Sequence, residues 1–385
     1  MKRIHDEAFG LAAEPQLRSA LASLLKVPED EAEAILAERI KNVQAFIAVL
    51  FGNSADLTPH QYKKAKLSLP CFSAAKWDDV AGQHGLPQAY QRLRTGGANA
   101  YSAPTCYLAP SFHRAVFQNG WRVLDVYQES EVQTREAARV RTLEPFLVAV
   151  MAIFRGRIID KPESPMRRTL ETSGGEVVHE ILAAEGALFF VVELKLLMTS
   201  EQDHVAQLFL EMLSAAEENA DIPTNRQLRI HGLLTDLSTY HFYSYDPVEK
   251  KFAFDLVTVV SGVREEKLGR MIPVTNKIFS ILLAAYIGVL KTRAEDEAYA
   301  RVDYPNALAL ANEAHTLFTK KSASKDELET QANKALTVLQ QSISIVPREA
   351  QLTSELEPEP VTADELERVA DRWVDRYCLR ALKPS

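Results

Sequence analysis

The sequence predicts a chain of the α/β (α+β) class, in which a mixed sheet is flanked by helices and carries helical N- and C-terminal extensions. Apolar residues recur at helical spacing on both sides of the middle of the chain, strand-like runs gather between about residues 157 and 262, and one amphipathic helix falls among these strands. With 385 residues, the chain is long enough for a large core and for more than one structural unit.

The N-terminal part, residues 1–130, is expected to be a helical region. Helical spacing runs from about residue 15 to residue 52, and acidic residues follow Pro28 where a first turn would begin. Prolines and glycines then interrupt the pattern, and the stretch from Tyr101 to Pro110 is typical of an irregular connector. A long helix is predicted from about Ser130 to Arg155, with Pro145 as a point of kinking.

The central part, residues 131–265, is expected to form the sheet. A short link that contains Gly186 joins two strand-like runs, which is typical of a hairpin. The predicted elements are strands at Glu176–Leu182 and Leu188–Leu197, a helix at about Ser200–Asn219, and strands at Leu228–Leu234, Thr239–Tyr245 and Lys251–Val260. A single amphipathic helix between such runs indicates a sheet covered by helices.

The C-terminal part, residues 266–385, is predicted to be helical again. The expected helices are Ile272–Arg293, about Asn306–Lys320, Lys325–Ile345 and a last helix that contains Trp373 and Tyr377. An acidic linker with two prolines, residues 355–360, precedes that last helix.

Composition sets the expected environment of the chain. Hydrophobic residues make up 46% and charged residues 25%, as in ordinary soluble globular proteins. The three cysteines, Cys71, Cys106 and Cys378, indicate neither a disulfide framework nor a cysteine zinc site. We find no uninterrupted apolar stretch long enough for a bilayer and no secretory signal, so we expect an intracellular, cytoplasmic or nuclear protein without a membrane partner. The net charge of −8 argues against a broadly basic surface that coats nucleic acid.

Two charges interrupt a strand that otherwise reads as fully buried. Glu193 and Lys195 are two residues apart, so they point to the same face of the strand, while Val192 and Leu194 line the other face. An unpaired charge is costly to bury. The pair is therefore either a metal-binding and catalytic element or a structural ion pair, and the segment alone leaves both interpretations open.

The register of the predicted hairpin decides which residues join this pair. If Glu185 and Gly186 form a two-residue turn, Glu176 lies opposite Lys195 and Val178 lies opposite Glu193. Glu180 then shares the same face, whereas a slip of one residue would bring Val177 and His179 there instead. Two carboxylates this close repel each other unless a divalent cation lies between them.

The order of these elements resembles the core of the PD-(D/E)XK nuclease superfamily. The order is a helix, a hairpin with an acid on its first strand and Glu-x-Lys on its second, an amphipathic helix and a further strand. Over about residues 140–260, the stretch GGEVVHEILAAEGALFFVVELKLLMTSEQDHVAQLFLEMLSAA is similar to a large group of uncharacterised fungal proteins thought to belong to that superfamily. The resemblance implies a restriction endonuclease-like sheet and a Mg²⁺- or Mn²⁺-dependent site that hydrolyses phosphodiester bonds in DNA or RNA.

Carried over to this sequence, the resemblance implies that Glu176 and Glu193 bind the metal and that Lys195 assists the attacking water. Glu144, His179, Glu180 and Gln207 are weaker candidates for supporting positions. The chain lacks a Pro-Asp pair before the hairpin and has Val178 where the family pattern has an aspartate. The alternative is therefore a catalytically inactive nuclease fold that serves as a nucleic-acid- or protein-binding module.

The other histidines suggest no second site in the sequence. His204, His231 and His241 fall on different predicted elements, and none has the spacing of a His-Glu-x-x-His zinc helix. We expect core or surface roles for them.

Overall fold

A computed structural model describes residues 70–95, 100–169, 171–183, 186–349, 365–372 and 374 of the chain. The helices expected within residues 15–52, the acidic linker at 355–360 and the aromatic residues Trp373 and Tyr377 lie outside these ranges, as does Glu185 in the predicted turn. Residues 365–372 and 374 are helical, in agreement with part of the last predicted helix.

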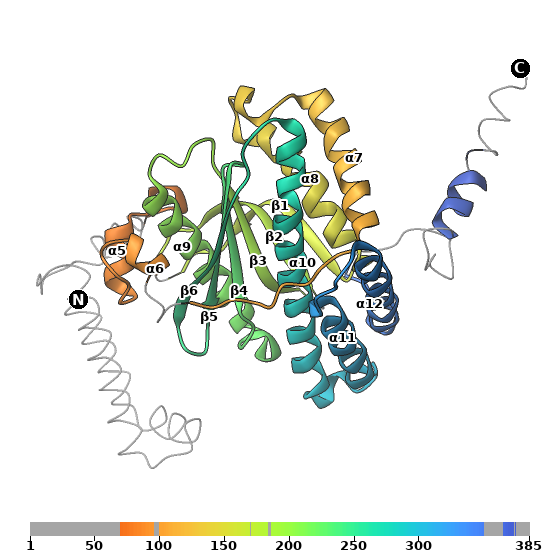
Figure 1. The fold of residues 1–385 in the computed structure, drawn as a ribbon. Coiled ribbons are helices and arrows are strands. Elements are labelled where there is room, and N and C mark those ends of the chain that lie inside the picture. The colour runs from red at the N-terminus through yellow and green to blue at the C-terminus, as the bar shows by residue number, and fades with distance from the viewer. Residues whose placement is uncertain are drawn as a thin grey trace, which may run out of the picture.

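Six strands form one mixed sheet at the centre of the molecule (Figure 1). Their order in the sheet is their order in the sequence, and every neighbouring pair is antiparallel except β3 and β4, which are parallel. The helix α9 supplies the crossover between these two parallel strands. The strands are β1 (Ile158–Met166), β2 (Gly175–Ala183), β3 (Ala187–Leu194), β4 (Ile230–Thr235), β5 (Thr239–Asp246) and β6 (Lys251–Val259).

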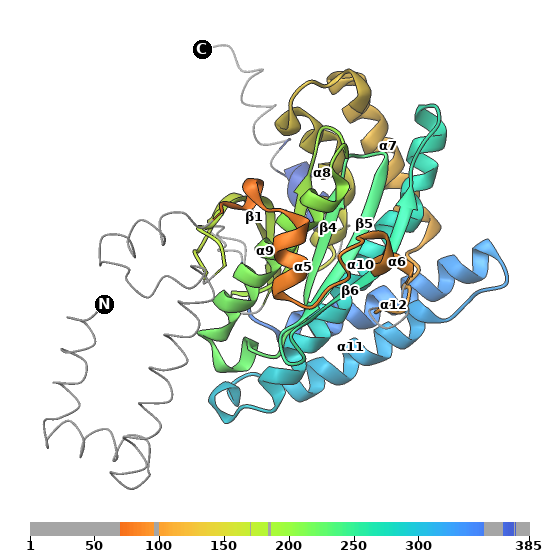
Figure 2. The same ribbon diagram turned by 90° about the vertical axis from the view of Figure 1, so that its left-hand side faces the viewer.

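Helices cover both faces of the sheet. In Figures 1 and 2, α9 lies on one face with α5 outside it, while α8 and the long α10 lie on the other face with α7, α11 and α12 around them. Two apolar clusters fill these layers, one under α9 and a larger one that extends from Cys106 to Val346. The helices are α5 (Trp77–Gln83), α6 (Gln91–Thr95), α7 (Pro110–Tyr127), α8 (Glu136–Ala152), α9 (Glu201–Ala220), α10 (Arg264–Ala294), α11 (Tyr304–Thr319) and α12 (Lys325–Ile345).

The α/β class, the five strands from β2 to β6 and the helix α9 agree with the sequence prediction. Two elements were not predicted. The strand β1 contains Pro162 and Pro165, which is why it reads as a loop, and it lies at the edge of the sheet, where proline is tolerated. The helix α7 begins with Pro110 and contains Gly120, whose missing side chain admits Leu268 and Phe146 to close contact.

The hairpin between β2 and β3 contains an irregularity that the turn alone did not predict. Ala183 pairs with Ala187, which is one residue away from the register that a two-residue turn at Glu185 and Gly186 predicts, and the register shifts between Ile181 and Leu182. Beyond the shift the expected register returns, with His179 opposite Val192, and the recorded pairing ends there.

A side chain from α9 stabilises β3 next to this irregularity. The amide of Asn219 accepts a hydrogen bond from the backbone N–H of Leu188 (3.0 Å) and donates one to its carbonyl oxygen (2.5 Å). The ladder between β3 and β4 begins only at Phe190 and His231, so Leu188 lies beyond it. Asn219 therefore satisfies two buried backbone groups that a neighbouring strand would otherwise satisfy.

The helix α10 is the one described helix that is long and apolar enough to cross a membrane by length and composition alone, although we expected no such stretch. In its most apolar window, 72% of the residues are buried in the protein, as in a core helix. Polar side chains of α10 also hold the irregular connector that precedes α7. Ser280 accepts from the N–H of Cys106 (2.8 Å) and Asn276 accepts from that of Leu108 (3.1 Å).

Replacing Asn219 with leucine is expected to destabilise the protein. The variant leaves the N–H and carbonyl of Leu188 buried without partners, which should lower the free energy of unfolding by about 2–4 kcal/mol. Urea unfolding measures this change. The same substitution at Asn312, which is exposed on α11, is the control and should change stability by less than about 0.5 kcal/mol. Equal effects at the two positions would contradict this role of Asn219.

Candidate active site at the carboxyl end of β3

The sheet places Glu193 and Lys195 at the carboxyl end of β3. Glu193 pairs with Leu234 of the parallel strand β4, and the backbone N–H of Lys195 donates to the carbonyl oxygen of Thr235 (2.9 Å). The ladder thus continues to Lys195 and fixes the direction of both side chains. Ligand sites in α/β sheets often lie outside the carboxyl ends of such strands.

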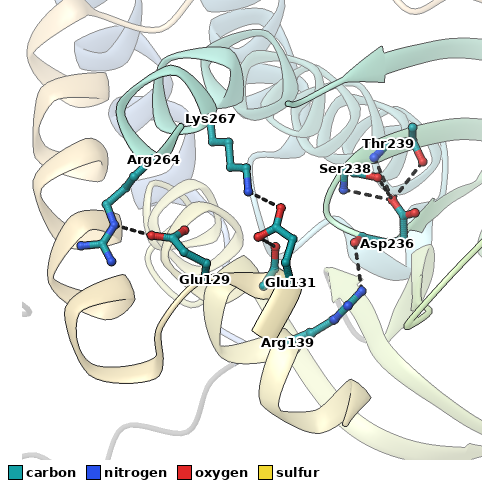
Figure 3. A network of polar contacts seen from close by, with 9 residues as sticks. Glu129, Glu131, Arg139, Asp236, Ser238, Thr239, Arg264 and Lys267 are labelled. Carbon is teal, nitrogen blue, oxygen red and sulfur yellow. Dashed lines mark hydrogen bonds and ion pairs between the residues drawn. The ribbon is translucent and has the colours of Figure 1, made fainter. Parts of the chain in front are cut away.

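The helix α8 fixes the loops that follow the two parallel strands. The guanidinium of Arg139, which is buried, donates to the carbonyl oxygens of Leu196 after β3 and Asp236 after β4. The carboxylate of Asp236 in turn accepts from Ser238 and Thr239, which closes the turn into β5 (Figure 3).

Ion pairs next to Arg139 attach the same region to α10. Figure 3 shows Lys267 paired with Glu131 and Arg264 paired with Glu129. The acidic partners belong to the segment that leads into α8, so α8 and α10 are joined at the end of the sheet where the loop after β3 lies.

Glu193 belongs to a cluster of four connected side chains. The ammonium of Lys195 is 2.6 Å from Oε1 of Glu193. Nε2 of Gln207 donates to the same oxygen (2.8 Å) and also to Oε1 of Glu211 (2.8 Å). Gln207 and Glu211 are one turn apart on α9, which brings both onto the face of the helix that covers β3. We call Glu193, Lys195, Gln207 and Glu211 the Glu-Lys centre.

Burial dominates the electrostatics of the Glu-Lys centre. Burial raises the pKa of Glu193, and Lys195 opposes this effect. Burial also acts against the charged amine of Lys195, but the nearby Glu193 carboxylate outweighs it and raises the lysine pKa. The pKa of Glu211 is raised well above its usual range, first by complete burial and then by the charge of Glu193. Glu193 and Lys195 therefore form an ion pair beside a neutral Glu211 carboxyl.

The oxygen atoms of the centre suit a divalent metal ion. Glu193 and Glu211 each offer carboxyl oxygens, which the Gln207 amide nitrogen bridges, and oxygen ligands are those that Mg²⁺ and Mn²⁺ prefer. Oε2 of Glu211 is buried and has no hydrogen-bond partner among the described residues. Those residues contain no group of three or more His, Cys, Asp or Glu side chains arranged around a metal position, so a metal here would retain water ligands.

The structure does not bring Glu176 into the Glu-Lys centre. Its side chain is exposed near the start of β2, opposite Pro165 of β1, and no hydrogen bond or ion pair is recorded between it and Glu193 or Lys195 within the described residues. The recorded pairing of β2 with β3 ends before this part of the strand. Val178 is half-buried against the apolar cluster on the α8 and α10 side of the sheet.

Of the weaker candidates, only Gln207 contacts the Glu-Lys centre. Glu144 instead pairs with Arg141 on α8 (2.7 Å). Nδ1 of His179 lies 2.7 Å from a carboxylate oxygen of Asp160 on β1. Glu180 lies opposite Val191, and burial raises its pKa.

The sequence analysis did not select Glu211. The available signal was its position four residues after Gln207, because residues at this spacing share one face of a helix. The sequence alone does not show that this face of the helix packs over β3, so it does not connect Glu211 with Glu193.

No family model, no curated protein and no solved structure matched the chain when it was compared with them. The assignment of the site therefore depends on the geometry of the chain itself.

Replacing Glu211 with glutamine is expected to stabilise the protein increasingly as the pH rises. The raised pKa means that folded Glu211 holds a proton that the unfolded chain releases, so its contribution to stability falls once the pH exceeds the unfolded pKa. Glutamine has no such proton. The variant should gain about 1–3 kcal/mol over the wild type at pH 8, and the gain should shrink towards pH 5.

Chemical unfolding between pH 5 and 8 measures this difference. The control is Glu313→Gln, which makes the same chemical change at an exposed position on α11 and should show no comparable trend. A stability difference for Glu211→Gln that stays constant across this pH range would contradict a neutral, buried Glu211.

Proposed function

We propose that this chain is a divalent-metal-dependent nuclease that hydrolyses phosphodiester bonds in DNA or RNA at the Glu-Lys centre. The observation that carries the proposal is the convergence of two carboxyl groups, one amide and one lysine at the carboxyl end of a central strand. Buried acids with raised pKa values that lie close together are typical of functional sites.

The arrangement of elements supports a restriction endonuclease-like core as part of this proposal. The helix α8, the hairpin of β2 and β3, the helix α9 and the parallel strand β4 follow one another in the order on which the sequence resemblance rests, with the strand β1 added before the hairpin. The Glu-x-Lys element lies on β3, and Gln207 of the following helix contacts it. The proposal extends to about residues 140–260, where the resemblance was found.

Each residue of the Glu-Lys centre has a role in the proposed reaction. Glu193 and Glu211 would hold Mg²⁺ or Mn²⁺, and Glu211 takes the place that the sequence analysis gave to Glu176. When bound, such an ion lowers the pKa of a coordinated water and offsets charge on the phosphate. The ammonium of Lys195 donates hydrogen bonds that orient the attacking water, and Gln207 holds the two carboxyl groups in place.

A second candidate is a catalytically inactive nuclease-like module. Glu193 is already paired with Lys195, Glu211 is enclosed, and the exposed Glu176 stays apart from both. With Val178 at the position of the family's aspartate, the ion pair then serves only the structure. Metal binding distinguishes the two candidates, because the inactive module has no need of a cation.

The nuclease proposal predicts metal-dependent cleavage by the purified full chain. Labelled single- and double-stranded DNA and RNA are incubated with Mg²⁺, Mn²⁺ or a chelator. Cleavage is expected with metal only, and Lys195→Ala should reduce the rate by about 100-fold or more, because the group that orients the attacking water is lost. Glu176→Gln is the matched control and should retain activity, since Glu176 lies outside the centre.

A parallel metal titration makes a negative result informative. Mn²⁺ is expected to raise the melting temperature of the wild-type chain but not that of Glu211→Gln, which lacks one carboxylate. A folded wild-type protein that neither cleaves any substrate nor responds to Mn²⁺ would favour the inactive module. Loss of cleavage in Glu176→Gln would instead restore Glu176 as the second metal ligand.

A further inference from the structure

A separate cavity lies at the opposite end of the same parallel strands. It has a volume of about 230 Å³ and is bounded by the starts of β3 and β4 and by the C-terminal half of α10. Phe189 of β3 lies in its wall, whereas Glu193, four residues later on the strand, belongs to the Glu-Lys centre. The strand β3 therefore contributes to two different sites.

Small residues on α10 leave this volume open. Ala284, Ala285 and Gly288 line the cavity on the helix side, and Leu228 lines it on the other. A Cβ atom built on Gly288 would lie 3.6 Å from Leu228, which is an ordinary contact, so no close approach of the backbone requires glycine there. The cavity thus exists because large side chains are absent from this face of α10.

A buried histidine lines this cavity without a hydrogen-bond partner. His231 of β4 is 3% exposed, and its Nδ1 atom is buried with no partner among the described residues. Buried polar atoms in folded proteins are nearly always hydrogen-bonded, so an unpartnered nitrogen on a side chain that lines a cavity is one reason to look for a ligand there. Burial, together with the cations Arg229 and Lys277, lowers the pKa of His231 to about 3, so the ring is neutral and carries one N–H donor.

Two cations, Arg229 and Lys291, and one acid, Glu295, line the cavity. The guanidinium of Arg229 lies over the ring of Tyr101 (4.1 Å to its centre) and pairs with Asp246 behind it. Lys291 also lines the cavity, with Glu295 one turn further along α10. The two cations that lower the pKa of His231 are each paired with an acid, Arg229 with Asp246 and Lys277 with Asp255.

We propose that this cavity binds a small organic anion, a carboxylate or phosphate monoester carried on a single ring or an apolar body of similar size. The acidic group accepts a hydrogen bond from His231 and faces Arg229 and Lys291, while the apolar body packs against Phe189, Leu228 and the small residues of α10. The cavity of about 230 Å³ is large enough for a single-ring ligand, because an apolar cavity of about 150 Å³ holds benzene. This site is independent of the proposed nuclease centre.

Isothermal titration of the full chain with four probes tests the proposal. Benzoate and phenyl phosphate carry the two candidate acids on one ring, benzyl alcohol supplies the ring without charge, and inorganic phosphate supplies the charge without a ring. We expect one of the ring anions to bind with a Kd of about 1 mM or tighter, and each of the other two probes at least about tenfold more weakly. Whichever acid binds more tightly identifies the head group.

Two substitutions at Gly288 locate the binding. Gly288→Leu fills the cavity and should weaken binding of the ring anion by at least about tenfold, whereas Gly288→Ala adds only one ordinary contact and should change it less than about threefold. His231→Leu should weaken the ring anions and leave benzyl alcohol unchanged. Circular dichroism and the melting temperature verify that each variant is folded.

Three results would overturn the proposal. Absence of binding of both ring anions to the wild type at about 10 mM would exclude the site as proposed. Equal affinity for benzyl alcohol would exclude recognition of an acid, and unchanged binding in a folded Gly288→Leu variant would place the ligand elsewhere.

Discussion

The burial of Glu193 on the central strand is the constraint on which the surrounding arrangement depends, because the neighbouring side chains must satisfy its charge. A carboxylate at 4% exposure must be paired, and Lys195 provides the one cation in contact with it among the described residues. Gln207 adds a hydrogen bond and extends the network to Glu211, whose pKa is raised by its complete burial and then by the charge of Glu193. Because apolar residues in place of a buried ion pair are often as stable or more stable, we take these charges to serve a function.

The fold keeps this centre in place by connecting it to both layers of helices. The helix α9 supplies Gln207 and Glu211 from one face, and its Asn219 binds the other end of β3. From the opposite layer, Arg139 of α8 binds the loops after β3 and β4. The strand that carries Glu193 is therefore fixed at both ends by polar side chains, in addition to its two neighbouring strands.

The sequence predicted those parts of the fold and site that depend on short-range patterns. Alternation and turn residues located β2 to β6, and the two-residue spacing identified Glu193 and Lys195. The prolines of β1 obscured an edge strand, because a sequence pattern does not reveal which strand lacks a second neighbour. Glu176 was selected from the register of the hairpin, but the recorded strand pairing ends before it, and the distant contact of Glu211 with Glu193 depends on how α9 packs.

The two ends of the parallel pair differ in charge, and this difference bears on the proposed chemistry. Glu193 and Glu211 lie at the carboxyl end, while His231 and Arg229 lie towards the other end, about 10 Å and about 16 Å away along the strands. A phosphodiester that approaches the carboxyl end meets two acids and a lysine that is already paired. With Glu193 paired to Lys195 and Glu211 neutral, the centre has little net charge to attract a phosphodiester, so in the proposed reaction a bound cation would supply the positive charge that the centre lacks. A small anion without a metal is attracted instead to the cavity at the amino end.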